Sequence, residues 1–245
     1  MIDIHGHYLP GIDDGAESLQ TAVAMCRLAA EDGCEAVIAT PHQRHAVWDN
    51  RDPEGLEMLR RRLQEAVGER PEVHLGAEIR IGSGLLDDLD RPDRGRLTPL
   101  AGSRHLLLEY GRGERPRGCE DLVHELTVAG WRPILAHPEL IRFLAEDLDL
   151  MERLAEAGAL FQVTAASLTG DFGGLFRRKA WQIVERGLCH FVASDAHGEE
   201  WRPPGLARAR SLIARRLGEE TARRLTDENA RGILRQGYVV PSGLR

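Results

Sequence analysis

Seven short apolar runs, separated by amphipathic stretches, constrain the fold of this chain more than any other feature of its sequence. The runs cover residues 1–5, 35–40, 72–79, 105–110, 132–136, 159–164 and 189–194. Each has the length of a strand, and the segments between them repeat apolar residues at intervals of three and four, as amphipathic helices do. Repeated strand–helix units favour a parallel sheet, and seven or eight of them usually close into a barrel. We therefore predict an α/β barrel.

Glycines occur in this pattern at the positions where the predicted helices should end. Gly33, Gly130, Gly158 and Gly187 each follow a helical stretch and precede a strand, which is where a helix-ending glycine belongs. We find no sequence repeat, low-complexity segment or linker. Because a length of 245 residues suits one barrel, we predict a single domain over residues 1–245.

Charge and composition argue against several classes of protein. The formal net charge is −7 and no basic tail offsets it, so we expect no nucleic-acid partner. No apolar run approaches the ~20 residues of a membrane span, and the first residues lack the basic and apolar regions of a signal peptide. Four cysteines lie without CxxC spacing, as buried free thiols do. We predict a cytoplasmic, reduced protein that does not insert into a membrane.

Histidines and carboxylates gather at the carboxyl ends of the predicted strands. Six of the seven strands contribute, and one further acid lies in the loop after the first strand. The nine residues, called here the ligand-type residues, are His5, His7, Asp14, His42, Glu78, Glu109, His137, Asp195 and His197. A parallel barrel builds its active site at this edge, so the coincidence of strand ends and metal-binding residue types favours one shared site.

Each ligand-type residue alone has an ordinary structural explanation, as a loop-capping histidine or a strand-end ion-pair partner. Together, five histidines and four carboxylates at one barrel edge would repel and desolvate one another at a large cost without cations. We therefore predict a cluster of metal ions. Four other histidines are expected to pack or to lie on the surface: His74, His105, His124 and His190. His45, beside the site loop, is a candidate substrate contact.

At these residues the chain resembles the PHP (polymerase and histidinol phosphatase) superfamily. It is most similar to the bacterial protein-tyrosine phosphatases encoded with capsule and exopolysaccharide genes, over nearly its whole length. The His-x-His pair, the isolated histidine and the Asp-x-His pair fit the superfamily in general. The narrower signals are the stretches GIDDG, TAASLTG, and SDAH followed by RPP.

The resemblance implies a distorted TIM-like barrel of seven strand–helix units, the PHP fold, holding three divalent cations that are often manganese. Carried over position by position, one ion takes His5, His7, Glu78 and Asp195, a second takes Asp14, His42 and His197, and a third takes Glu109 and His137 with Glu78 as a bridge. Mixed imidazole and carboxylate ligands suit manganese, iron or zinc better than calcium or magnesium alone.

Two arginines are candidates for binding the phosphate of a substrate. Arg202, five residues after His197, resembles the arginine that holds the substrate phosphate in the family. Arg44, in the loop after His42, is a second candidate. Both are predicted as catalytic residues beside the metal ions.

The chemistry favoured by these residues is hydrolysis of a phosphate monoester by a metal-bridging hydroxide. Three divalent ions would exceed the charge of four carboxylates, attract a phosphate dianion and lower the pKa of a bridging water. No cysteine is followed six residues later by arginine, which excludes the cysteine-nucleophile mechanism. A P-loop and a G-x-S-x-G elbow are also absent from the sequence.

The predicted substrate is phosphotyrosine on a protein, namely the tail of a polysaccharide-synthesis tyrosine kinase. Trp48 and Trp201 offer ring-sized surfaces beside the site. Leu140 departs from the family, because many relatives carry arginine there, and Arg142 lies two positions later. A phosphatase for a small monoester such as histidinol phosphate is therefore an alternative, and a non-catalytic regulatory binding protein is a second. Association into a homo-oligomer stays open.

Overall fold

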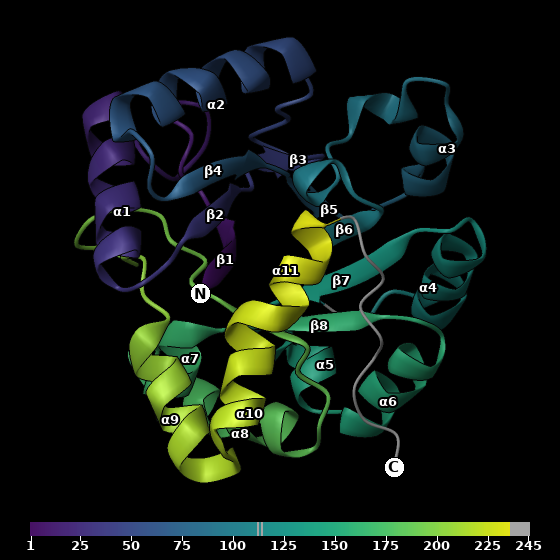
Figure 1. Cartoon of the computed structure of the whole chain (residues 1–245). Coiled ribbons are helices and arrows are strands. Elements are labelled where there is room, and N and C mark those ends of the chain that lie inside the picture. The colour runs from purple at the N-terminus through teal and green to yellow at the C-terminus, as the bar shows by residue number, and fades with distance from the viewer. Residues whose placement is uncertain (112, 114, 236–245) are drawn as a thin grey trace.

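All paired strands run parallel to their neighbours in the part of the chain that the structure describes, residues 1–111, 113 and 115–235. The structure is a computed structural model (Figure 1). One sheet has the order β1-β2-β4 and the other the order β3-β5-β6-β7-β8-β9. The strands are β1 (Ile2–Gly6), β2 (Ala36–Ala39), β3 (His42–Gln43), β4 (Glu72–Leu75), β5 (Glu78–Arg80), β6 (His105–Glu109), β7 (Arg132–Ala136), β8 (Leu160–Thr164) and β9 (Phe191–Ala193).

Helices surround the strands (Figure 1). Local signals start the two longest: the Ser18 side chain accepts a hydrogen bond from the Thr21 N–H before α1, and Pro53 opens α2. The helices are α1 (Leu19–Glu31), α2 (Pro53–Val67), α3 (Leu85–Asp90), α4 (Cys119–Val128), α5 (Arg142–Ala145), α6 (Leu148–Glu156), α7 (Ala165–Thr169), α8 (Gly174–Glu185), α9 (Ala207–Leu217), α10 (Glu219–Arg223) and α11 (Asn229–Leu234), with a π-helical turn over 224–228.

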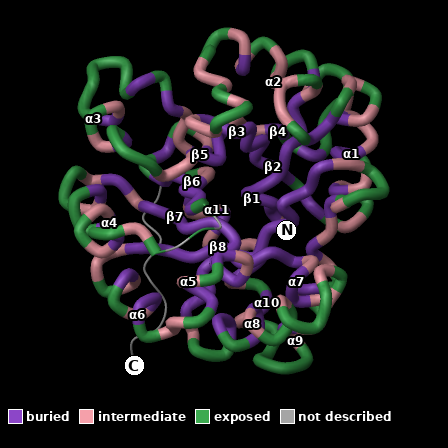
Figure 2. The backbone as a smooth tube through the Cα atoms, turned by 180° about the vertical axis from the view of Figure 1, so that it is seen from behind, coloured by how far each residue is buried: buried purple, intermediate pink, exposed green. Residues whose placement is uncertain are grey.

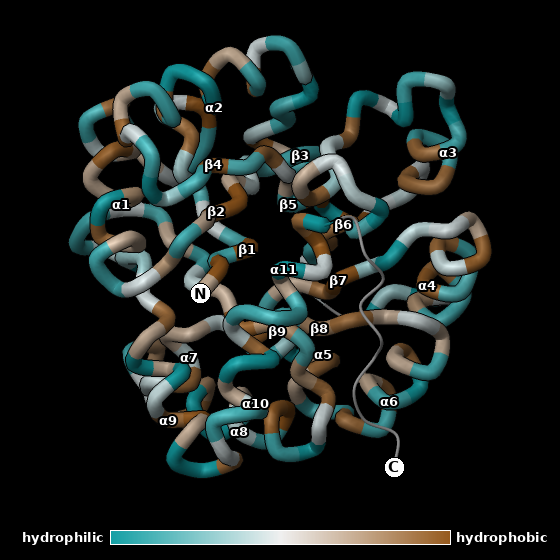
Figure 3. The backbone as a smooth tube through the Cα atoms, in the orientation of Figure 1, coloured by the Kyte–Doolittle hydropathy of each residue, from teal (hydrophilic) through white to brown (hydrophobic). Residues whose placement is uncertain are grey.

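Two apolar layers hold these elements together. Alternate residues of β1, β2 and β6–β9 face a shared interior, where Ile4, Ile38 and Ile134 pack with Ala230 and Ile233 of α11. The intervening strand residues pack outward against the helices. Figure 2 shows burial concentrated on the strands, and Figure 3 shows apolar residues along them with hydrophilic residues on the outer turns of the helices. The interior layer joins strands of both sheets.

The predicted strands match the structure except in the third apolar run. Residues 72–79 form two strands, because β4 pairs with β2 whereas β5 pairs with β3 and β6. The chain changes sheets at Gly76, where a Cβ atom would lie 2.7 Å from the Leu100 side chain and 3.3 Å from its Cα. The sequence predicts that Glu78 ends the third strand. In the structure Glu78 begins β5 instead. The short strand β3, which contains His42, was not predicted.

The two sheets meet where β1 lies beside the segment that follows β9. Gly6 and Ala196 form a parallel bridge, and the Asp195 N–H donates to the His5 carbonyl at 2.9 Å. Below this junction, the fully buried Asp3 carboxylate accepts hydrogen bonds from Tyr8 Oη at 2.8 Å and from the Ser194 N–H at 3.0 Å. The carboxyl ends of β1 and β9 are thus fixed beside each other.

The cysteines are buried and unpaired, as predicted, and burial raises the pKa of the Cys26 thiol to about 12. Within the described residues, no helix has the length and apolar character needed to cross a bilayer.

Buried His190 makes stability depend on pH. Burial lowers its pKa to about 4, and its Nδ1 accepts a hydrogen bond from the Phe161 N–H at 3.1 Å. An unfolded histidine titrates near 6.5, so below that pH the unfolded chain binds a proton that the folded chain does not. The stability present above pH 6.5 is lost as the pH falls towards about 4.

We expect His190→Asn, which keeps an acceptor for the Phe161 N–H, to lose less stability than the wild type between pH 7 and pH 5. The difference should be about 1–2 kcal/mol, because one proton per molecule is worth about 1.4 kcal/mol per pH unit. Denaturant unfolding of both metal-free proteins at the two pH values measures it. Equal losses of stability in the two proteins would show that His190 does not cause this pH dependence.

Candidate metal centre

The nine ligand-type residues lie together at one edge of the strands. Seven of them line a cavity of about 240 Å³, and His5 and His7 lie buried beside them. Their ligand atoms form four overlapping groups, each with its atoms within 4.8 Å of one another. The groups are His7, Asp14, His42 and His197; His5, His137 and Asp195; His5, His7 and Glu78; and His42, Glu78 and Glu109.

Hydrogen bonds orient His5, in β1, and His7, which follows this strand directly. His5 Nδ1 donates to Gln162 Oε1 at 2.9 Å, and His7 Nδ1 donates to Asp13 Oδ2 at 2.8 Å. Each ring therefore turns its Nε2 towards the Glu78 carboxylate, at 3.5 Å for His5 and 3.6 Å for His7. Both Nε2 atoms are buried without a hydrogen-bond partner. Oriented imidazoles with unpartnered nitrogens aimed at carboxylates fit a metal site.

Asp13 and Gln162 were not predicted from the sequence. Asp13 is the first acid of the GIDDG stretch, and it also accepts a hydrogen bond from the His42 N–H at 3.2 Å. The loop folds tightly over β1, since a Cβ atom on Gly15 would lie 2.2 Å from the His7 carbonyl oxygen. Gln162 is a fully buried polar residue inside the apolar strand β8. In the sequence, an amide in the middle of an apolar run could have indicated a special role for Gln162.

Glu78 is the centre of the cluster. Its carboxylate lies 2.8 Å from His137 Nε2 and 3.0 Å from His42 Nδ1. Burial alone would raise the pKa of Glu78, but His5, His137 and His42 outweigh burial and hold its pKa well below the usual value. This carboxylate is therefore ionised and shared among several imidazoles, as a bridging ligand would be.

Asp14 lies at the open side of the cluster, with a side chain that is 35% exposed. Its Oδ1 lies 3.3 Å from His42 Nε2 and 3.6 Å from His197 Nε2. These three residues form the set that the resemblance implied for one ion. The set implied for the third ion is more spread out, because Glu109 lies 4.0 Å from His137 and groups with His42 and Glu78.

Protons balance the carboxylates of this cluster. Burial alone would lower the pKa of His42 and His137, but neighbouring carboxylates raise both to about 9. His197 differs, because burial together with the charge of His7 lowers its pKa to about 3. The positive charge held by His42 and His137 is charge that divalent cations would supply in their place, since metal binding displaces ligand protons.

The backbone is strained at several of these positions. His137 has φ of 35°, Asp195 has φ of 55° and Arg202 has φ of 52°. Residues other than glycine rarely adopt this left-handed conformation, which costs free energy and clusters at functional sites. The strain is held in place by hydrogen bonds such as that from His197 Nδ1 to the Asp195 carbonyl oxygen at 2.9 Å.

The two predicted arginines have different surroundings. Arg202 lines the cavity, where its guanidinium contacts the Asp195 carboxylate and lies 3.1 Å from His197 Nε2. Arg44 points to the loop before α3 and donates to the Asp88 carboxylate and, at 2.6 Å, to the Ser83 carbonyl oxygen. It is not among the residues that line the cavity.

Arg80 was not predicted, yet it lines the cavity and pairs with Glu109 at 2.9 Å. It lies two residues after Glu78 on β5, so the two-residue period of a strand places both side chains on one face. This two-residue spacing from Glu78 could have indicated from the sequence that Arg80 faces the same site.

Comparisons with known proteins identify the family. The family model described as "Capsular polysaccharide synthesis, CpsB/CapC" matches residues 1–235. The chain belongs to the CpsB/CapC family. The tyrosine-protein phosphatase YwqE of Bacillus subtilis (strain 168) is 36% identical over 244 residues, covering 98% of this chain and 93% of YwqE. The tyrosine-protein phosphatase CpsB of Streptococcus agalactiae serotype V is 27% identical over 248 residues, covering 98% of this chain and 100% of CpsB.

The fold also matches a solved structure of this family. It is described among crystal structures of YwqE from Bacillus subtilis and CpsB from Streptococcus pneumoniae, "unique metal-dependent tyrosine phosphatases". The two chains share 34% identity and a TM-score of 0.92, with full coverage of both.

Aromatic side chains flank the cavity of this CpsB/CapC chain. His45 and Trp48 line it, and the Trp48 ring stacks on His42 with centroids 5.5 Å apart. Trp201 lies edge-on to His197 at 5.8 Å and is 65% exposed. The other four histidines are not among the lining residues, as expected.

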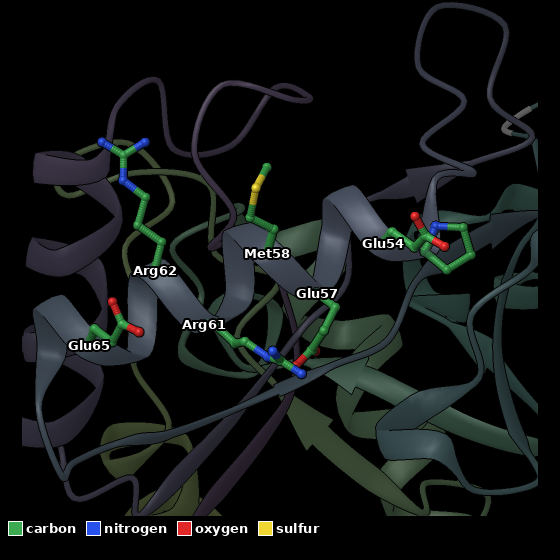
Figure 4. A pocket seen from close by; sticks show the side chains of 7 residues that line it. Glu54, Glu57, Met58, Arg61, Arg62 and Glu65 are labelled. Atoms are coloured by element: carbon green, nitrogen blue, oxygen red, sulfur yellow. The ribbon is translucent and has the colours of Figure 1, made fainter.

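A larger hollow lies elsewhere, on the outward face of α2 (Figure 4). It measures about 640 Å³, but it is lined by residues of this one helix. Its charged residues pair locally, as Glu57 does with Arg61 at 2.8 Å, and no ligand-type residue lines it. Size alone therefore does not indicate the functional site.

Asp13 offers a test of the orienting hydrogen bonds. We expect Asp13→Asn to weaken Mn²⁺ binding by roughly 10–100-fold, because a metal-binding imidazole depends on the group that accepts its second N–H. Competition with a chromophoric chelator measures the affinity. The matched control Asp90→Asn changes an exposed acid of α3 and should bind like the wild type. Unchanged affinity in Asp13→Asn would contradict the role of this residue.

Proposed function

We propose that this chain is a metal-dependent tyrosine-protein phosphatase. The observation that carries the proposal is the cluster of eight buried ligand-type residues and the exposed Asp14, with unpartnered imidazole nitrogens turned towards shared carboxylates. Relatives that match nearly the full chain are tyrosine-protein phosphatases, and the solved structures are described as metal-dependent.

The proposed cofactor is a set of three divalent ions, manganese in the first instance, with iron and zinc as alternatives. The ligand-type residues would hold them, with Glu78 as a shared ligand. When bound, such ions neutralise phosphate charge and lower the pKa of a coordinated water. The mixture of imidazole and carboxylate donors supports transition metals over calcium.

The chain's own residues would position the phosphate. Arg202 and Arg80 bring two guanidinium groups to the wall of the cavity. Arginine suits this role because its planar fork of N–H donors matches phosphate oxygens. The cysteines are buried, and none is among the residues that line the cavity, which supports a mechanism without a thiol nucleophile.

We extend the proposal to the fold, the location and the partner. A distorted barrel of seven strand–helix units in a single domain over residues 1–245 is supported by the interior shared between the two sheets. Four unpaired, buried cysteines support a reducing cytoplasm. The family's description supports a protein substrate in capsular polysaccharide synthesis, and we propose the tail of a tyrosine kinase.

A small phosphate monoester is the second candidate substrate. The observation in its favour is Leu140, an apolar residue that lines the cavity at the position where the family resemblance implies arginine. Steady-state rates on a tyrosine phosphopeptide and on histidinol phosphate separate the candidates. A clear preference for the small substrate would replace our proposal.

The metal-dependent mechanism predicts opposite responses to chelation and to thiol removal. A chelator should abolish hydrolysis of a tyrosine phosphopeptide, and Mn²⁺ should restore it. Cys→Ala changes at all four positions should leave turnover within about threefold, since buried structural thiols are inert. Activity that survives chelation, or that is lost with one thiol in a folded variant, would contradict the mechanism.

Two matched variants, Arg202→Ala and Arg44→Ala, test which arginine binds the substrate phosphate. Arg202→Ala should raise KM for a phosphopeptide by roughly 10–100-fold, since a hydrogen bond to a charged group contributes about 1.5–3 kcal/mol. Arg44→Ala should keep KM within about twofold and lower stability, because its partner is Asp88. Metal content is measured in both variants. Equal KM values for Arg202→Ala and the wild type would remove Arg202 from the site.

A further inference from the structure

A second cavity of about 640 Å³ adjoins the metal centre. Its lining consists of Asp14, Leu140, Phe172, Phe176, Trp201 and Arg202, which we call the aromatic annex. Asp14, Leu140 and Arg202 line both cavities. A ligand with one end among the ligand-type residues can therefore extend past these three side chains into the annex.

The annex differs in character from the metal centre. Its lining side chains are mainly apolar, and the rings come from two separate segments. Phe172 precedes α8 and Phe176 lies in its first turn, whereas Trp201 comes from the loop after β9. Trp201 is 65% exposed, and the phenylalanines are half-buried. A large apolar surface left open beside a charged cavity is typical of a binding surface.

Arg202 connects the two cavities. Its guanidinium carbon lies 5.8 Å from the Phe172 ring centre and 5.4 Å from that of Trp201. The same guanidinium reaches the Asp195 carboxylate in the metal centre. Aromatic faces hold an arginine in place while leaving its N–H groups free to donate, so the annex holds the Arg202 guanidinium at the boundary of the metal centre.

We propose that the aromatic annex binds the phenyl ring of a phosphotyrosyl group whose phosphate occupies the metal centre. The inference rests on the proposed function and names the part of the substrate that the chain recognises. Leu140 then has a role as an apolar contact at the boundary of the two cavities. The annex selects aryl over alkyl phosphates by burying the ring against Phe172, Phe176 and Trp201.

Phosphonates test this selection without leaving-group chemistry, because their P–C bond is not hydrolysed. Benzylphosphonate carries the ring of a phosphotyrosyl group and ethylphosphonate does not. Calorimetric titration of the Mn²⁺-loaded full-length protein should give an affinity at least about tenfold higher for benzylphosphonate, from the apolar area of the ring. Equal affinities in the wild type would overturn the proposal.

Three variants locate the effect. Phe176→Ala and Trp201→Ala should each reduce the benzyl-to-ethyl affinity ratio by about threefold or more. Phe176→Ala leaves both rings beside Arg202 in place, so its ethylphosphonate affinity should stay within about twofold of the wild type. Leu140→Arg should tighten both phosphonates through its new charge but lower the ratio, because the apolar contact of Leu140 with the ring is lost. The control Leu175→Ala removes an exposed apolar side chain of α8 outside the annex and should keep the wild-type ratio. A ratio unchanged in both Phe176→Ala and Trp201→Ala would overturn the annex.

The outcomes also separate this inference from the proposed function. Metal-dependent hydrolysis of phosphotyrosine with no preference for benzylphosphonate would support the phosphatase activity and refute ring binding in the annex. A benzyl preference that depends on Phe176, in a protein that hydrolyses no phosphotyrosine, supports the annex and removes the proposed activity.

Discussion

Two carboxylates, Glu78 at the start of β5 and Asp195 just after β9, are buried almost completely, and this arrangement requires positive charge beside them. A buried ionised carboxylate without a partner is strongly destabilising. The histidines at neighbouring strand ends supply that charge, and the pKa values of His42 and His137, raised to about 9, show that the compensation is mutual. The buried carboxylates of the cluster therefore favour the binding of cations. Divalent ions would supply more charge in less space than protons on separate rings, which is the physical reason to propose metal binding here.

The charge cluster in turn depends on how the two sheets are joined. Asp3 lies two residues before His5 and accepts hydrogen bonds from the backbone of Ser194, one residue before Asp195. It also accepts from Tyr8 Oη. One buried carboxylate thus sets the relative position of two ligand-type residues that are nearly 200 residues apart in the chain. Since hydrogen-bonded buried networks are stiff, the junction holds the metal centre to a narrow geometry before any ion binds.

Much of this site could be predicted from the sequence, because strand ends and ligand types are local signals. Apolar runs place the strands, and a parallel sheet brings their carboxyl ends together, so all nine ligand-type residues could be named. The missing pieces depend on tertiary structure. The break at Gly76 follows from the close approach of Leu100, which no local pattern reveals. Gln162 is a lone amide in an apolar run, but its role as the partner of His5 follows only from the contact between the two residues. The annex joins Phe176 to Trp201 across segments that are distant in the sequence.

Arg202 links the electrostatics of the metal centre to recognition of the substrate. Its guanidinium contacts the Asp195 carboxylate, while Phe172 and Trp201 hold its flat faces. A cation bound by Asp195 would compete with Arg202 for that carboxylate. Because the aromatic rings still confine the guanidinium to the edge of the cavity, its donors would need another acceptor there. Phosphate oxygens meet that need, so occupation of the metal centre would leave the arginine ready for a phosphate whose organic group lies on the same aromatic surface.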